Sequence, residues 1–316
     1  MHTKVTESTK NQFYDLGSAV ISITPEQGVD LYALDGIKRN SNHRHSELYA
    51  NAVTIGLQKK QDLLIIVSLD LIWVDKVFTE KVRKWVNSYC DINTIHLLLV
   101  ATHSHSTPQI SSKICNSARP DSGYLSFLYD QIRKVIEKAL NNREKCYAEL
   151  TISSPNLSVN RRKKILSLTE LKNRTLKTII ANRPNPSGLC DDSLYSIWFY
   201  DEKDQEKSVL LNYACHPTLF RKNAISSDYP GEVSNYLKKQ VSKELVVCFL
   251  QGFAGNIKAN IVQKSCFHYR RLLPYIYNCL FDRVQFNKNI SRQQLKSFSV
   301  KLAMSSLERK KEKFIN

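Results

Sequence analysis

Two histidines separated by one residue, His103 and His105, directly follow the largely apolar run Ile95–Val100. The run has the length of a buried strand, and side chains two apart in an extended segment point to the same side. Both imidazoles are therefore expected to face one cavity. Such a pair suits half of a zinc site, or a metal ligand beside a proton carrier. Taken alone, the pair is more typical of a polar turn.

A third histidine, His216, also comes at the end of an apolar stretch, and Pro217 fixes the backbone that follows it. Two more strand ends carry polar or small residues. One ends at Asp70, and the other leads into the loop containing Gly252 and Gly255, where the backbone can come close to a ligand. Ligands of α/β sheets bind outside the carboxyl ends of strands, so these four strand ends are expected to line one cleft. Together, the three histidines favour a metal or catalytic site.

Two further positions leave a structural and a functional interpretation open. Asp228 precedes a predicted helix, where it either caps the helix or orients a ligand histidine through a hydrogen bond. Arg161 and Arg162 lie in a basic stretch. A guanidinium is a rigid fork of donors that can hold a carboxylate or an oxyanion, although arginines in so basic a region are commonly just solvated.

The apolar spacing predicts buried strands that alternate with helices. The predicted strands are 18–24, 48–57, 62–70, 95–101, 147–153, 195–200, 209–213 and 245–250. The predicted helices are 77–89, 124–140, 229–241 and 269–281. This alternation indicates one α/β domain. We place it at residues 18–285, between a flexible N-terminus (1–17) and a basic C-terminal tail (286–316), with a long basic excursion at 155–192.

The chain has 316 residues, 42% of them hydrophobic, and a formal net charge of +17. That charge fits a solvated basic shell, an acidic ligand or peripheral contact with an anionic membrane. The basic residues 161–164, beside the predicted cleft, are the candidate for this membrane contact. No nucleic-acid-binding module is recognisable, so a nucleic-acid partner is not expected.

The eight cysteines are scattered, without a Cys-x-x-Cys pair. This usage predicts reduced thiols rather than a disulfide frame or a zinc knuckle. No stretch has the length of a membrane span, and the N-terminus lacks the apolar core of a signal peptide. We therefore expect a cytoplasmic protein, with peripheral membrane contact as the open alternative.

Eight motifs, in order along residues 18–262, resemble the N-terminal catalytic domain of the neutral/alkaline non-lysosomal ceramidase family, particularly its shorter bacterial-type members. The motifs lie at 23–25, 45–50, 68–70, 101–106, 160–162, 212–218, 227–231 and 250–256. No single motif is specific, but their shared order is. The resemblance implies a ceramidase-like α/β fold, with mixed sheets flanked by helices.

The resemblance also implies a zinc amidase that cleaves the N-acyl bond of ceramide into a fatty acid and a sphingoid base. His103 and His216 match zinc-binding histidines of the family, whereas His105 and Arg161 match residues that contact the reacting carbonyl or carboxylate. This agrees with the interpretation from the residues alone, because zinc polarises a carbonyl and lowers the pKa of its bound water to about 7.

The chain departs from the family pattern in the segment Gly255–Asn260. Lys258 stands where the family has a serine essential for ceramide cleavage, and Asn256 stands at an aspartate position. A hydrolase of a linear amide other than ceramide is the leading hypothesis. The alternative is a catalytically impaired relative that binds a lipid or acyl ligand, or a protein partner.

The second departure concerns the remaining zinc ligands of the family, a glutamate and a tyrosine that come from sequence well after this segment. No matching motif is recognisable between residue 262 and Asn316. Three explanations stay open: Asp70, Asp228 or His45 completes the site, the chain is truncated, or the protein no longer catalyses.

Overall fold

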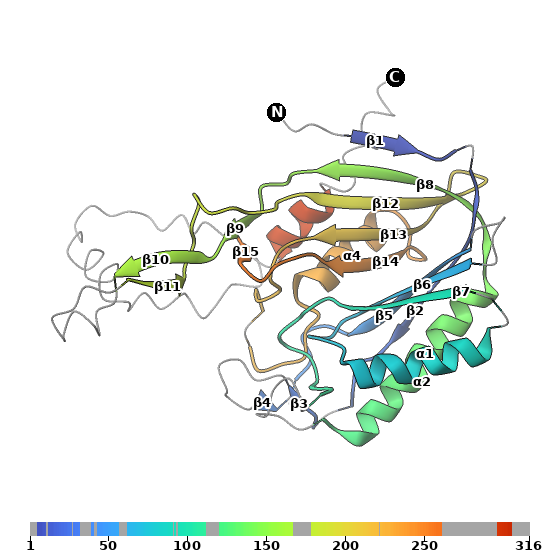
Figure 1. Ribbon diagram of the computed structural model, residues 1–316, viewed down its shortest axis with the longest axis horizontal. Coiled ribbons are helices and arrows are strands. Elements are labelled where there is room, and N and C mark those ends of the chain that lie inside the picture. Colours follow the sequence, from blue (N-terminus) through green and yellow to red (C-terminus); the bar gives the residue numbers. More distant parts are fainter. Residues whose placement is uncertain are drawn as a thin grey trace.

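The computed structural model describes residues 5–10, 12–26, 28–31, 39–40, 43–56, 62–90, 92, 94–111, 120–166, 178–220, 222–260 and 296–304. Most strands form one nine-stranded sheet in the order β14-β13-β12-β8-β2-β5-β6-β7, with β1 paired to β8 (Figure 1). These strands are β1 Val5–Ser8, β2 Tyr14–Ser22, β5 Tyr49–Gly56, β6 Asp62–Leu69, β7 Thr94–Ala101, β8 Glu144–Ser153, β12 Leu194–Asp201, β13 Glu206–Tyr213 and β14 Val246–Gln251.

Three small antiparallel pairs lie outside this sheet. They are β3 (Asp30–Leu31) with β4 (Arg39–Asn40), β10 (Arg162–Leu166) with β11 (Thr178–Asn182), and β9 (Ser158–Asn160) with β15 (Ile257–Ala259). The helices are α1 (Lys76–Tyr89), α2 (Ser122–Asn141) and α4 (Asp228–Gln240), and residues 296–304 are also helical. In the part of the chain that the structure describes, no helix is long and apolar enough to span a membrane.

The large sheet folds over on itself, which gives four layers from helix through two halves of the sheet to helix (Figure 1). One core lies between α1, α2 and the half formed by β2 and β5–β7; Val82 of α1 and Ile65 of β6 belong to it. A second core packs α4 and the 296–304 helix against β12–β14. A third, with Val53 of β5 and Leu210 of β13, fills the space between the two halves. Burial on both faces explains the nearly continuous apolar sequence of these strands.

The sheet is mixed, which confirms the predicted α/β class. β6 pairs with β7 in parallel, and β13 pairs with β14 in parallel, whereas the other pairs in the large sheet are antiparallel. The folded sheet brings the carboxyl ends of these two parallel pairs to the same side of the molecule. The predicted strands 195–200 and 209–213 are confirmed as β12 and β13, which pair with each other as an antiparallel hairpin. The predicted helix over residues 269–281 lies outside the described residues.

The structure differs from the sequence predictions at both ends and in the basic excursion. Within the predicted flexible N-terminus, 1–17, Val5–Ser8 pairs with β8 and β2 begins at Tyr14. Within the predicted tail, 286–316, residues 296–304 form a helix whose Phe298 and Leu302 are buried in the second core. The excursion, 155–192, contains the strands β9, β10 and β11. These segments were missed because each has too few apolar positions to show a clear period.

A single glycine fixes the distance between the sheet and α2. A Cβ atom built on Gly17 of β2 would lie 1.7 Å from the backbone oxygen of Ala139 in α2 and 2.8 Å from its carbonyl carbon. Because both clashing atoms are backbone, α2 must move to accept any side chain. We therefore expect Gly17→Ala to lower the free energy of unfolding by about 3 kcal/mol or more.

Urea denaturation of the purified protein measures this effect. Gly56→Ala in β5 is the matched control, because the nearest atom to its added Cβ is 3.4 Å away, an ordinary contact. The control is expected to stay within about 0.5 kcal/mol of the original protein. Equal stability of the two variants would contradict the tight approach of α2.

Candidate metal centre

The loop that carries the His-x-His pair is fixed by backbone hydrogen bonds to the end of the neighbouring strand. After β7 ends, the Thr102 amide donates to the Leu69 carbonyl and the His103 amide donates to the Leu71 carbonyl, both at 2.9 Å. His103 has a φ of 69°, which is uncommon for a residue with a side chain. Such a conformation persists only where the surroundings enforce it, as is common at functional sites.

The structure brings the three predicted histidines together. His103, His105 and His216 each offer a ring nitrogen, and these nitrogens all lie within 4.8 Å of one another. The Nε2 atoms of His105 and His216 are 2.9 Å apart, a hydrogen-bond distance. His105 and His216 are buried and His103 is half-buried. Three inward-facing imidazoles at this spacing make a candidate metal centre.

Two of these imidazoles are oriented by backbone carbonyl groups. Nδ1 of His103 donates to the Ile72 oxygen at 2.8 Å, and Nδ1 of His216 donates to the Ala254 oxygen at 3.2 Å. A carbonyl only accepts, so the proton sits on Nδ1 and the Nε2 lone pair is left for a ligand. This is how metal-binding histidines are usually held. These contacts could not be predicted from the sequence, because every residue has a carbonyl group.

The electrostatics favour a neutral His103. Burial lowers its pKa, and the positive charge of Arg161 lowers it further, against the opposing effect of the Ile72 carbonyl. A neutral imidazole is the form that binds a metal. Cys215, next to His216 in the chain, is a weak competitor as a ligand, because complete burial raises the pKa of its thiol well above the usual value.

Arg161 is close enough for its charge to act on His103, and it is held by the loop after β14. Its guanidinium donates to the Gly255 carbonyl from Nε at 3.2 Å and from Nη2 at 3.0 Å. Its backbone amide donates to the Asn256 carbonyl at 2.7 Å. The side chains of Arg161 and Arg162 both reach Gly255, so this loop organises the basic stretch.

The loop after β14 and the strand β15 that follows it carry the remaining predicted site residues, which differ in their surroundings. A Cβ on Gly252 would lie 3.0 Å from the Ala214 amide nitrogen, so this glycine allows close backbone packing next to the site. Nothing crowds Gly255, which is exposed, as is Asn256. The backbone of Lys258 forms a parallel bridge with His216. The departure from the family pattern therefore lies immediately beside a histidine of the cluster.

Asp70 lies behind the cluster rather than in it. Its carboxylate accepts from the Tyr49 amide at 2.9 Å and from the Thr102 hydroxyl at 3.4 Å, and it borders a small internal pocket. Thr102 precedes His103, so Asp70 supports the loop that carries the ligand. Burial raises its pKa to about 7, although the Tyr49 and Thr102 hydrogen bonds and the charge of Lys238 act in the opposite direction.

Asp228 is likewise outside the three-histidine group. Its carboxylate accepts from the Leu219 and Phe220 amides, at 3.3 and 2.8 Å, and from the Tyr229 amide at 2.7 Å. The first two contacts fix the turn that follows His216, and the third lies at the start of α4. Asp228 therefore fixes the turn that follows His216 and the start of α4, where Ser227 is the N-cap residue and Asp228 is the first residue of the helix.

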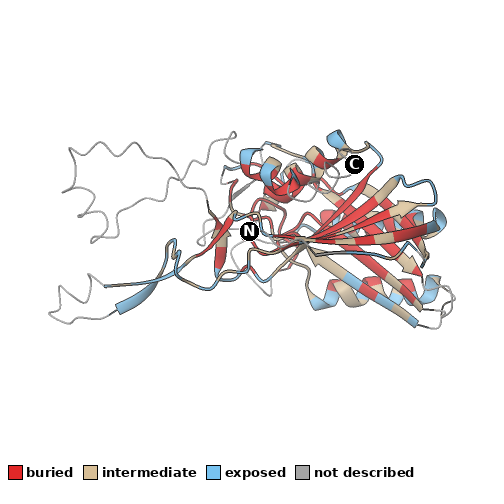
Figure 2. Cartoon of the chain, turned by 90° about the horizontal axis from the view of Figure 1, so that it is seen from above, coloured by how far each residue is buried: buried red, intermediate tan, exposed pale blue. Residues whose placement is uncertain are grey.

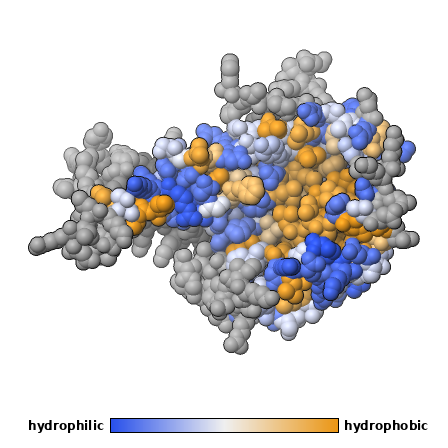
Figure 3. Space-filling model, in the orientation of Figure 1, coloured by the Kyte–Doolittle hydropathy of each residue, from blue (hydrophilic) through white to orange (hydrophobic). Residues whose placement is uncertain are grey.

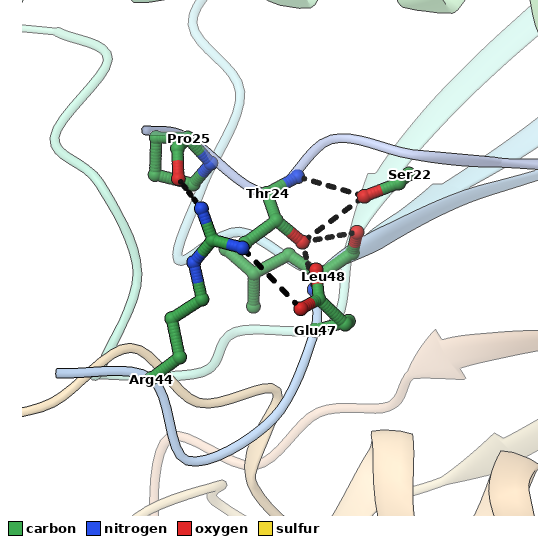
Figure 4. Close-up of polar contacts among 6 residues, drawn as sticks. All are labelled: Ser22, Thr24, Pro25, Arg44, Glu47 and Leu48. Carbon is green, nitrogen blue, oxygen red and sulfur yellow. Dashed lines mark hydrogen bonds and ion pairs between the residues drawn. The ribbon is translucent and has the colours of Figure 1, made fainter. Parts of the chain in front are cut away.

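His45 does not join the cluster either. Its ring stacks on Phe220 with centroids 4.4 Å apart. Its loop is fixed at both ends, where Arg44 donates to the Pro25 carbonyl and the Leu48 amide donates to the Thr24 hydroxyl (Figure 4). His45 is thus part of the wall of packed residues around the site. None of the local candidates (Asp70, Asp228 or His45) belongs to the three-residue group found among the described residues.

A serine layer beneath the His-x-His pair was missed by sequence reasoning. The Ser104 hydroxyl donates to the Ser226 carbonyl at 2.7 Å, and the Ser226 amide donates to the Ser106 carbonyl at 2.9 Å. These bonds clamp the loop of His103 and His105 to the segment before α4. Ser104 and Ser106, next to His103 and His105 in the sequence, could have indicated this layer, because serine side chains commonly form hydrogen bonds with nearby backbone groups.

The fold and the site define an α/β protein with a candidate three-histidine metal centre at the strand ends. The chain belongs to the neutral/alkaline non-lysosomal ceramidase family, because the model for the N-terminal part of that family matches residues 14–289. This confirms the resemblance inferred from the motifs. No curated protein sequence matches the chain significantly.

Two solved structures share the fold. The neutral ceramidase from Pseudomonas aeruginosa aligns with a TM-score of 0.72 at 20% identity, covering 94% of this chain and 44% of the ceramidase. A ceramidase complexed with C2 aligns with a TM-score of 0.70, with the same identity and coverage. The chain therefore spans less than half the length of either relative, and the likeness establishes the fold.

The raised pKa of Asp70 predicts how stability depends on pH. The unfolded chain loses this proton near the ordinary pKa of an aspartate, 3.8, whereas the folded chain holds it until about pH 7. Between these values the folded state binds more protons, so the free energy of unfolding falls as pH rises and levels off above pH 7. The loss is on the order of a few kcal/mol, at about 1.4 kcal/mol per pKa unit.

Asp70→Asn is expected to remove this component, because an amide keeps both hydrogen bonds and never ionises. Urea denaturation at several pH values between about 4 and 8 measures it. Asp130→Asn, on the exposed face of α2, is the control and should follow the original pH profile. An unchanged profile for Asp70→Asn would show that Asp70 is ionised across the whole range.

Proposed function

We propose that this protein is a zinc-dependent hydrolase that cleaves a linear N-acyl amide. The observation that carries the proposal is the convergence of three imidazoles on one point, with nitrogens within 4.8 Å of each other. Family membership supports hydrolysis of this bond, and Arg161 beside the cluster supplies the positive charge that the reaction requires.

The donor set fits zinc. Imidazole nitrogens are among the ligands that zinc prefers, and anchored Nδ1 protons leave Nε2 of His103 and His216 available. These two residues would hold the ion. When bound, zinc supplies Lewis-acid polarisation of the acyl carbonyl and lowers the pKa of a bound water.

His105 would move the proton. Its Nε2 lies 2.9 Å from Nε2 of His216, so it faces the same point as the ligands and can carry a proton there. In amide cleavage, the amine leaves only after its nitrogen gains a proton. We assign that transfer to Nε2 of His105, a general acid that typically contributes a factor of about 10² to 10⁴ to the rate.

Arg161 would stabilise the charge that develops on the acyl oxygen, and later the product carboxylate. Its guanidinium is oriented by the Gly255 carbonyl and acts electrostatically on His103. A charge that is already in place when the reaction begins needs no reorganisation in the transition state. This position next to the cluster is the geometric basis of the assignment.

The substrate class follows from the family and from the departure within the site. A solved relative is described as a ceramidase complexed with C2, and we extend the family's lipid amide chemistry to this chain. Lys258 and Asn256 replace the family's serine and aspartate, and Lys258 adjoins His216. We therefore propose a linear lipid amide whose amine part differs from that of ceramide.

The same observation supports a second candidate function. Lys258 lacks the hydroxyl that the family uses, at a position whose backbone pairs with a cluster histidine. In this alternative the protein keeps the cluster and binds an acyl ligand without cleaving it. The two candidates separate on turnover: an enzyme releases fatty acid from an N-acyl amide, whereas a binder retains the intact molecule.

Substitution of the histidines one at a time tests the assigned roles. His103→Asn and His216→Ala are expected to weaken zinc binding at least tenfold, whereas His105→Gln keeps the zinc and loses hydrolysis about a hundredfold or more. Asparagine is chosen at position 103 because it tolerates the positive φ. Elemental analysis after dialysis against zinc, together with fatty-acid release, measures both properties.

His45→Ala is the control, because His45 packs near the site on Phe220 without joining the cluster. This variant should bind as much zinc as the original protein. If His103→Asn keeps its zinc, the metal centre is wrong. If His105→Gln loses zinc together with the other two, His105 is a ligand and the proton must come from elsewhere.

A further inference from the structure

A two-stranded arm leaves the body of the protein directly at the candidate site. β9 pairs with β15, next to the bridge between Lys258 and His216, and the chain then runs through Arg161 into β10. β10 and β11 pair only with each other among the described strands. Figures 1 and 2 show the pair projecting from the body, with its residues largely exposed.

An arm of this kind has no evident structural purpose in water. An isolated two-stranded hairpin is marginally stable unless another surface covers it. Here eight of the ten strand residues are exposed and the other two are only partly buried. The arm therefore presents its side chains to something outside the described fold.

The side chains change character along the arm. The pair nearest the body is Arg162 with Asn182, and the next is Lys163 with Ala181. The more distant pairs contain Ile180, Ile179 and Leu166. These three apolar side chains are exposed, Ile180 to 68%. Among the described residues of the arm, Arg162 and Lys163 thus lie nearer the body than the apolar residues, and Lys164 lies opposite Ile180. Hydrophilic and hydrophobic residues are both visible in the projecting arm in Figure 3.

This order matches the profile of a membrane interface. Apolar side chains gain free energy in the acyl region, while lysine and arginine stay at the level of anionic headgroups. From Arg161 to Leu189 the sequence contains eight lysines and arginines against one acidic residue, Glu170. A nucleic acid would complement the charge but would give no role to exposed isoleucines.

Further exposed apolar residues lie on the same side of the molecule, around the site. Phe253 is 97% exposed and precedes Ala254, whose carbonyl holds His216. Leu189 is 91% exposed, and its carbonyl accepts a hydrogen bond from Asn160 in β9. Phe253 and Leu189 thus add exposed apolar side chains close to the candidate site and to the base of the arm.

We propose that the β10–β11 arm docks the protein on an anionic phospholipid bilayer, with Ile179, Ile180 and Leu166 entering the interface and Lys163 and Lys164 pairing with lipid phosphates. Docking brings the three-histidine cluster to the surface where an amide-linked lipid resides. This last step rests on the proposed function, whereas membrane binding itself does not.

Vesicle co-sedimentation of the full chain tests the proposal, with phosphatidylcholine vesicles compared with mixed phosphatidylcholine and phosphatidylglycerol vesicles. We expect preferential binding to the anionic vesicles that weakens at high salt. Ile179→Asp with Ile180→Asp should reduce binding at least tenfold. Lys163→Glu with Lys164→Glu should reduce binding to anionic vesicles by about fivefold per lysine.

Two control variants carry substitutions of the same kind on α1, at the opposite part of the body (Figure 1). Val77→Asp replaces an apolar residue that is 60% exposed, and Lys76→Glu with Lys84→Glu makes the same change in net charge. Both controls should bind vesicles like the original protein. Circular dichroism confirms that every variant is folded.

The proposal is overturned if the original protein binds neither vesicle type, or if the arm variants and the controls bind equally. Binding that depends on the lysines but not on the isoleucines also overturns it, in favour of a polyanion such as nucleic acid. Zinc content and hydrolysis of a water-soluble N-acyl amide, measured on the same samples without vesicles, report separately on the proposed function.

Discussion

The candidate site depends on two hydrogen bonds that orient the imidazole rings of His103 and His216. The Ile72 carbonyl accepts a hydrogen bond from Nδ1 of His103, and the Ala254 carbonyl accepts one from Nδ1 of His216. Without them, either ring could rotate or change tautomer, and the Nε2 atoms would not converge. Each carbonyl lies just beyond the end of a strand, so the strands of the sheet fix the positions of both carbonyls and, through them, the orientation of the two rings.

The folded-over sheet supplies that precision. β6 and β7 form one parallel pair and β13 and β14 the other, and a shared core between the two halves holds them in register. His103 comes from one half and His216 from the other. Helices on both outer faces then bury the remaining apolar surfaces of the sheet. The metal centre is therefore a property of the whole domain, assembled from residues 111 positions apart at His105 and His216.

Much of the fold could be predicted from the sequence because long, doubly buried strands are unusually apolar. The three histidines were found because each follows an apolar strand, although β7, which precedes His103, is only partly buried, with Leu98 51% exposed. Val5–Ser8 and the strands of the arm were missed, because they have too few apolar positions to show a period. Asp70 and Asp228 were singled out as possible ligands or supporting residues, and both are buried outside the three-histidine group. Their partners, mainly backbone amides, could only be seen in three dimensions.

The account rests on His103 and His216 binding one metal ion through nitrogen. X-ray absorption spectroscopy of the zinc-loaded protein measures this directly. It should show a first shell of nitrogen and oxygen at about 2.0–2.1 Å, with the outer-shell scattering of imidazole rings. A first shell of sulfur at about 2.3 Å, or a nitrogen and oxygen shell without imidazole scattering, would contradict it.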